Sequence, residues 1–277
     1  MVLASLREAL GLLVAKPVLW ITGLAMGSLS LPLLLVRYEG GTFMAGRLAL
    51  LQLVILPFFI AGSLGIIREG EGGPRAYVSS GRRFYFRVLL PLAVVLAAAM
   101  LTILLVMVPA SLISGGAMAA AGLVIPGIMV SFAFFTYFSD TAAVLEDRKA
   151  LDAVRRSVEF TIQHSLKVIL FYLVNLAILL AALFVGAAAW SLVLSRELAP
   201  LSRMNATEIA AVTPGDLAAL VGTGGIWVSA VVAFLLLTCC GTLAVAYRAC
   251  FFRKLAGASP AAPQQGEYDA KGRWYRY

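Results

Sequence analysis

Long runs without charged residues alternate with short charged segments along the chain. The uncharged runs are 17–36, 48–67, 88–139, 168–195 and 217–247. Each reaches the roughly 20 residues that cross a hydrocarbon core of about 30 Å. A charged side chain at the centre of a spanning helix costs about 2.5–3.5 kcal/mol, whereas Leu, Ile, Phe or Val each contribute only about 0.3–0.6 kcal/mol. The charge-free runs are therefore predicted to be membrane spans.

The run 88–139 is too long for one crossing, because it has more than twice the roughly 20 residues that a span needs. Ser114, Gly115 and Gly116 lie near its middle and provide the residues of a tight turn. We therefore expect a helical hairpin in this run. The six predicted spans are 18–36, 47–67, 88–111, 118–138, 168–193 and 224–248.

The composition supports this all-α, polytopic fold class. Hydrophobic residues make up 61% of the chain and charged residues 13%, whereas soluble domains have roughly 45–50% and about 25%. Residues 1–257 are predicted to form a single transmembrane domain. Residues 258–277 are polar and rich in Pro and Gln, so we expect a flexible cytoplasmic tail.

The positions of Lys and Arg predict the orientation in the cell membrane. If the N-terminus is cytoplasmic, 18 of the 22 Lys and Arg residues fall at the inner ends of the spans or in inner loops. Cytoplasmic loops carry this excess in membrane proteins. Both termini are therefore predicted to be cytoplasmic. The net charge of +8 is then a topology signal, and a nucleic-acid partner is not predicted.

Three cytoplasmic segments look like amphipathic helices at the membrane surface, each followed by a pair of spans. They are residues 5–16, 74–87 and 151–166, and the first opens with the capping-box pattern Ser5-x-x-Glu8. The third places apolar residues at spacings of three and four on one face. Two explanations stay open for this threefold pattern: internal duplication, or convergent design of three membrane anchors.

Small residues predict where helices pack closely. Gly23-x-x-x-Gly27 and Ala182-x-x-x-Gly186 each lie within a predicted span. Such motifs allow close backbone approach, which matters because lipid gives helices no hydrophobic drive to associate. The contacts can be internal or between two copies of the chain, and we expect internal packing. The three cysteines, Cys239, Cys240 and Cys250, imply no disulfide framework.

Two further features are candidate functional markers. Pro126-Gly127 lies in the middle of the fourth predicted span, where it predicts a helix kink; such breaks mark binding sites in some transporters, and others have no function. Asn205-Ala206-Thr207 is a glycosylation sequon in the predicted exterior loop 195–222. A helix is expected to begin at Thr213-Pro214-Gly215-Asp216 in the same loop.

The chemistry of known enzyme motifs is missing. Arg47, Asp140 and Arg248 lie near the ends of predicted spans, where snorkelling explains them, so no ionisable group is expected at depth. His164 is the only histidine, and we expect it on the polar side of the third surface helix. No P-loop, nucleophile-elbow or zinc-protease motif occurs. The sequence therefore predicts no catalytic residue, metal ion or cofactor, and no enzymatic activity.

Two segments carry a family resemblance. The stretch 137–147, followed by Arg155-Arg156-Ser157-Val158, and the stretch 80–87 resemble a prokaryotic group of six-helix membrane proteins. That group includes the membrane domain of glycerophosphoryl diester phosphodiesterases and archaeal and bacterial relatives. In those enzymes a separate soluble domain carries catalysis, and this chain has no room for it, so the resemblance implies the membrane layout and no activity.

Two functional hypotheses follow. The first is a non-enzymatic scaffold or accessory protein that holds anionic lipid, because each basic residue near an anionic surface contributes about 1 kcal/mol. The second is a transporter or lipid-handling permease for an apolar or amphipathic substrate, built around the kink at Pro126. Membrane lipids are the expected partners in both, with other membrane proteins or a second copy as further candidates. The predicted headgroup contacts are Arg82, Arg83, Arg87, Arg155, Arg156 and Lys167.

Overall fold

A computed structural model describes residues 1–38, 41–70, 72–114, 117–201, 204–205, 212–257, 266–268 and 274–276. Its transmembrane domain is all-helical, which confirms the predicted fold class. The elements are α1 (Val2–Ala15), the 3-10 helix η1 (Pro17–Leu19), α2 (Trp20–Tyr38), α3 (Thr42–Glu69), α4 (Pro74–Ser114), α5 (Ala117–Thr136), α6 (Ser139–Leu145), α7 (Ala150–Gln163), α8 (Ser165–Val193), α10 (Pro214–Ala256), β1 (Gly266–Tyr268) and β2 (Trp274–Arg276).

Six helical segments of the described chain are long and apolar enough to cross a membrane, as the charge pattern predicts. They are Pro17–Val36, Phe43–Glu69, Pro74–Pro109, Val124–Leu145, Ser165–Val193 and Ala219–Ala256. The predicted hairpin in the run 88–139 is also present, because α4 ends at Ser114 and α5 begins at Ala117.

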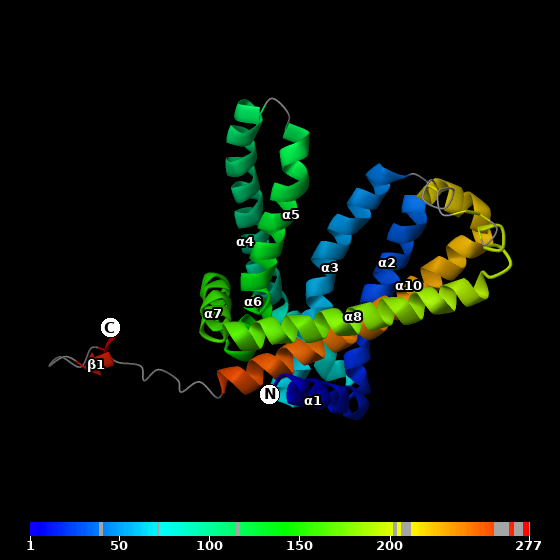
Figure 1. Cartoon of the computed structure of the whole chain (residues 1–277). Helices are drawn as coiled ribbons and strands as arrows, with labels where there is room; N and C mark the ends of the chain where they lie inside the picture. Colours follow the sequence, from blue (N-terminus) through cyan, green and yellow to red (C-terminus); the bar gives the residue numbers. More distant parts are fainter. Residues whose placement is uncertain are drawn as a thin grey trace.

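The spans form three hairpins that pack in a row. Along this row α5 contacts α4, α4 contacts α3, α3 contacts α2, α2 contacts α10, and α10 contacts α8. Figure 1 shows the hairpins α2–α3, α4–α5 and α8–α10 spreading from a common base, where α1, α6 and α7 also lie. The N-terminus and the end of α10 lie together at this base, because the Tyr247 hydroxyl donates to the Val2 carbonyl. The termini of the domain are thus at the same end.

The buried core is concentrated at the base and is rich in aromatic side chains. Phe138 of the turn between α5 and α6, Phe160 of α7 and Phe171 of α8 are fully buried and lie against Phe251 and Phe252 of α10. The outer parts of α4 and α8 instead expose apolar side chains such as those of residues 104–106 and 183–185. Long apolar helices with exposed apolar faces are what a lipid environment requires.

The predicted small-residue contacts are internal. A side chain at Gly23 or Gly27 would collide with the backbone of α10 near Thr238 and Phe234, and one at Gly186 would collide with Leu236. The first glycine motif therefore holds α2 against α10, and the second holds α8 against α10. This confirms the expectation of internal packing.

The surface segments differ in two respects from the prediction. α1 and α7 are separate helices, but the predicted second surface helix continues without a break through residue 87 into the span, as one helix of 41 residues. Gly81 and Pro91 both lie inside this helix and do not interrupt it. The expected capping box at Ser5 is also absent: α1 begins at Val2, and the Ser5 hydroxyl donates to the Met1 carbonyl.

The last helix begins as predicted. Thr213 caps α10, its hydroxyl accepts from the Asp216 amide, and the Asp216 carboxylate accepts from the Thr213 amide. Gly222 then breaks the helix with φ 63°, a left-handed conformation that favours glycine. The predicted span start near residue 224 lies just beyond this break.

Parts of the remaining predictions lie outside the described residues. Asn205 is exposed, but Ala206 and Thr207 of the sequon are not described. Of the predicted tail 258–277, the described residues are those of β1 and β2, which pair antiparallel with Gly266 opposite Arg276.

Candidate functional site

A cavity of about 360 Å³ lies between the hairpins α2–α3 and α4–α5, just above the base. Its walls are apolar side chains of α3, α4 and α5, and its floor is formed by the start of α6 and by one residue of α10. Ligand sites typically occupy about 300–1,000 Å³ and combine apolar walls with a few polar groups. The polar side chains at this floor include those of Tyr137, Ser139, Asp140 and Arg248. All lining residues belong to candidate spans.

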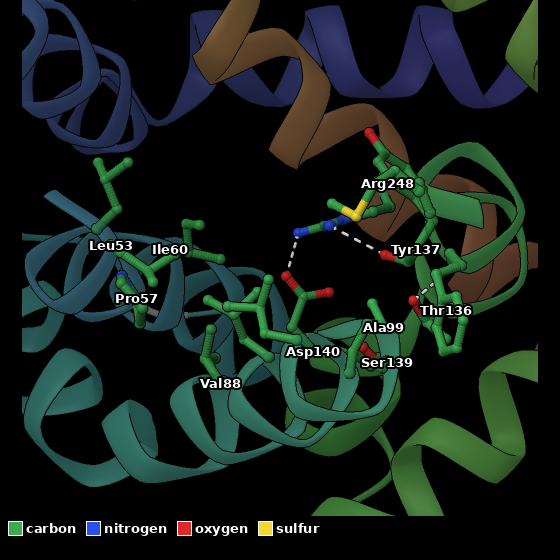
Figure 2. A pocket seen from close by; sticks show the side chains of 17 residues that line it. Leu53, Pro57, Ile60, Val88, Ala99, Thr136, Tyr137, Ser139, Asp140 and Arg248 are labelled. Carbon is green, nitrogen blue, oxygen red and sulfur yellow. Dashed lines mark hydrogen bonds and ion pairs between the residues drawn. The ribbon is translucent and has the colours of Figure 1, made fainter. Parts of the chain in front are cut away.

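A buried ion pair forms part of the floor of the cavity. The Arg248 Nη2 atom donates to Asp140 Oδ2 at 2.5 Å, and Nη1 donates to the Tyr137 carbonyl at 3.1 Å. The two charged side chains are only 10% and 15% exposed. Figure 2 shows the Arg248 side chain reaching from α10 to Asp140, with apolar residues of α3 such as Leu53 and Ile60 on the other side of the space. The guanidinium also lies over the Tyr137 ring.

The junction of α5 and α6 places Asp140 beside the cavity. α5 ends at Thr136, and after two turn residues α6 begins at Ser139. The fully buried Ser157 of α7 holds this junction: its hydroxyl accepts from the Phe138 amide and donates to the Phe135 carbonyl. Because these backbone groups lie at the end of one helix and the start of the next, they have no partner within either helix. A side chain of α7 thus fixes the turn that orients Asp140.

Further ion pairs join the helices at the base. Glu8 of α1 pairs with Arg253 and Lys254 of α10 at 2.5 and 2.7 Å. Burial favours the neutral form of Glu8, but hydrogen bonds from Lys254 and Arg253 and their positive charges outweigh it and lower the pKa of Glu8 below its ordinary value. Asp147, between α6 and α7, pairs with both Arg68 and Arg87.

The predicted headgroup residues lie on α4, α7 and α8 around the base, and several already have carboxylate partners. Arg83 pairs with Glu69, Arg87 with Asp147, and Arg155 with Glu159. Arg156 makes three hydrogen bonds to Glu146 and is only 16% exposed. Arg82 and Lys167 are exposed. The six residues are therefore unequal as surface contacts, and Arg82, Arg83, Arg155 and Lys167 are the most accessible.

The predicted kink lies away from the cavity. Pro126 and Gly127 are inside α5 and exposed, whereas α5 lines the cavity with Met129, Phe132, Ala133 and Thr136. His164 also differs from expectation, because it is half-buried between α7 and α8 and stacks on the Phe160 ring.

Arg248 and Asp140 are the site residues that the sequence reasoning missed. Snorkelling explains each residue alone, but the two side chains face each other inside the bundle and do not reach outward. The two residues do lie near the ends of the predicted spans, as expected, but the explanation by snorkelling is wrong for this pair. One signal was available: a lone acid and a lone base stand at the same predicted membrane face, next to apolar runs.

The fold and this cavity define the class: a polytopic helical membrane protein with an internal, apolar site that ends at a buried ion pair. Residues 1–255 match the family described as Domain of unknown function (DUF7847), and the chain belongs to that family. Comparisons with curated proteins and with solved structures find no match.

Proposed function

We propose that this protein is a lipid-handling membrane protein that binds one amphipathic molecule inside its helical bundle, without catalysing a reaction. The observation that supports this function best is the cavity itself, because it combines apolar walls for a hydrocarbon chain with a polar floor at Arg248 and Asp140. A scaffold with a filled bundle needs no such space. Ionisable groups inside a membrane domain are costly, and where they occur they usually pair with one another and mark a functional site.

The site has the layout that an amphipathic guest requires. The chain of the guest would lie against Leu92, Val95 and Leu96 of α4, and its polar end would reach the floor. Entry from lipid is consistent with the position of the cavity between two hairpins that diverge from the base (Figure 1). Pro126 and Gly127 do not line the cavity and play no direct part in this arrangement.

Photolabelling tests this function. Purified protein in lipid nanodiscs is irradiated with a fatty alcohol that carries a diazirine on its chain, and labelled peptides are identified by mass spectrometry. We expect labels on α3, α4 and α5 at the cavity walls, and competition by unlabelled dodecanol. Labelling spread evenly over the exposed apolar faces, without competition, would remove the proposal.

A matched pair of variants sharpens this test. Ala99 is 2% exposed and lines the cavity, so Ala99→Phe fills it. Ala97, two residues earlier on α4, is exposed, and Ala97→Phe adds the same side chain toward lipid. We expect Ala99→Phe to reduce competed labelling by about tenfold, equivalent to about 1.4 kcal/mol, and Ala97→Phe to leave it unchanged.

A second function is a scaffold that holds anionic lipid at the base, and the exposure of Arg82 and Lys167 favours it. Neutralising Arg156 would break its contact with Glu146 and is a poor test. The better variant is Arg82→Gln with Lys167→Gln. We expect it to retain less co-purified anionic lipid than the wild type, and unchanged retention would count against this function.

We also propose that the resemblance to the membrane domain of glycerophosphoryl diester phosphodiesterases reflects a shared layout. The support is the likeness of the stretches 80–87 and 137–147 to that group, together with the six candidate spans of this chain. A solved structure of such a membrane domain would be expected to show the same row of hairpins, and a different helix order would contradict the relationship.

A further inference from the structure

The ion pair at the floor of the cavity has more free hydrogen-bond donors than free acceptors, whereas the hydroxyls of Tyr137 and Ser139 can either donate or accept. The guanidinium of Arg248 has five N–H groups. Its two hydrogen bonds go to Asp140 and to the Tyr137 carbonyl, and its buried Nε atom has no partner among the described residues. Both carboxylate oxygens of Asp140 already accept hydrogen bonds: Oδ1 from the Thr141 amide and hydroxyl, and Oδ2 from Arg248.

From this asymmetry we infer that the guest is an acidic amphiphile, whose carboxylate or phosphate head group is recognised by Arg248. The inference rests on the proposed function and names its ligand class. A planar guanidinium binds carboxylate and phosphate oxygens through charge-assisted hydrogen bonds, which are roughly twice as strong as neutral ones. An ammonium head group has only donors, so its N–H groups would face the N–H groups of Arg248, and two positive charges would lie side by side.

The charge of Asp140 does not exclude a second anion, because the base carries an excess of cations. Three carboxylates there each contact two basic side chains. These groups are Glu8 with Arg253 and Lys254, Asp147 with Arg68 and Arg87, and Glu146 with Arg148 and Arg156. Each group therefore has a net positive charge, and the summed field favours an anion near this end of the bundle.

Competition among single-chain amphiphiles of equal length tests the inference. Wild-type protein in nanodiscs is labelled with the diazirine-bearing fatty alcohol in the presence of dodecanoate, dodecyl phosphate, dodecanol or dodecylamine. We expect the two acids to compete at concentrations about tenfold lower than dodecanol, equivalent to about 1.4 kcal/mol, and dodecylamine to be the weakest. Dodecanoate against dodecyl phosphate then separates the two acid types, and inorganic phosphate without a chain should not compete.

The role of Arg248 is tested by changing both members of the pair, so that no charge is left buried alone. In Arg248→Met with Asp140→Leu, the ratio of dodecanol to dodecanoate competition should fall to about one, because no charge-assisted bond is left. The control, Arg155→Gln with Glu159→Gln, removes an equal pair from the exposed face of α7, and it should keep the wild-type ratio.

The outcomes separate this inference from the proposed function. If no amphiphile competes with the photolabel in the wild type, the proposed function fails. If dodecanol and dodecylamine compete as well as the acids do, the binding function stands and the acidic ligand class is wrong. The comparison in the wild type needs no variant, so the inference can be refuted even if the double variant does not fold.

Discussion

Arg248 of α10 and Asp140 of α6 are 108 residues apart in the sequence, yet their side chains form a buried ion pair at 2.5 Å. The pair joins the last span to the junction of α5 and α6, and thereby links two hairpins at the floor of the cavity. Because the Ser157 hydroxyl fixes the same junction, the position of Asp140 depends on α7 as well. The site is thus a product of the tertiary fold.

The ion pair predicts an asymmetric stability effect. Arg248→Met leaves the Asp140 carboxylate buried without its counter-charge, and removing one partner of a buried pair typically costs about 3–5 kcal/mol. Replacing both residues, as in Arg248→Met with Asp140→Leu, should cost less, because no lone charge is left. The free energy of unfolding in mixed micelles, titrated with a denaturing detergent, measures both. Equal losses in the two variants would contradict the structural role of the pair.

The close approach of α2 and α10 predicts a second effect. A side chain at Gly23 has no room beside Thr238 and Thr242, so Gly23→Leu must push the two helices apart. Overpacking of this kind typically costs about 1–3 kcal/mol. Gly46→Leu is the matched control, because nothing lies within 4 Å of a side chain at Gly46 in α3. The same unfolding titration should show a lower free energy of unfolding for Gly23→Leu and an unchanged one for Gly46→Leu.

The contact of Glu8 with Arg253 and Lys254 predicts a pH dependence. The pKa of Glu8 is lower in the folded protein than its ordinary value of 4.5. Its contribution to stability is therefore fully present above about pH 4.5 and is lost as the pH falls through the lower, folded pKa. Comparing wild type with Glu8→Gln between neutral and acidic pH measures this.

The difference in unfolding free energy between these two proteins should shrink on acidification. A difference that grows as the pH falls would contradict the assignment. Glu159→Gln on α7 removes the same charge from an exposed pair and is expected to change stability by less than about 1 kcal/mol.

The positive-inside pattern predicts which face of the membrane each loop occupies. In a background without Cys239, Cys240 and Cys250, single cysteines are introduced as Lys149→Cys and Asn205→Cys. Lys149 is exposed between α6 and α7, and Asn205 is exposed between α8 and α10. A membrane-impermeant maleimide added to intact cells should label only the second variant. Labelling of the first variant alone would invert the topology.

The number of spans and the close helix contacts could be predicted from the sequence because they depend on local physics. The cost of burying charge sets the ends of the spans, and the Ser114-Gly115-Gly116 turn divides the longest run where α4 and α5 meet. Gly23 and Gly27 reveal close packing because only glycine fits there.

The site could not be predicted in the same way, because it depends on which distant residues meet. Asp140 and Arg248 each stand at the end of an apolar run, where an isolated charge is ordinary. Only the packing of α10 against α6 brings them together. The basic surface residues could be found from the sequence, but their accessibility to lipid could not be compared. Arg87 and Arg156 have carboxylate partners in the connection between α6 and α7, and only the fold brings these together.

An experimental structure of the protein in lipid tests the central claim most directly. The account predicts elongated density between α3, α4 and α5, with its polar end within hydrogen-bonding distance of Arg248 (Figure 2). Density confined to the outer apolar faces, with the cavity closed by the side chains of Leu92, Leu96 and Phe132, would contradict it.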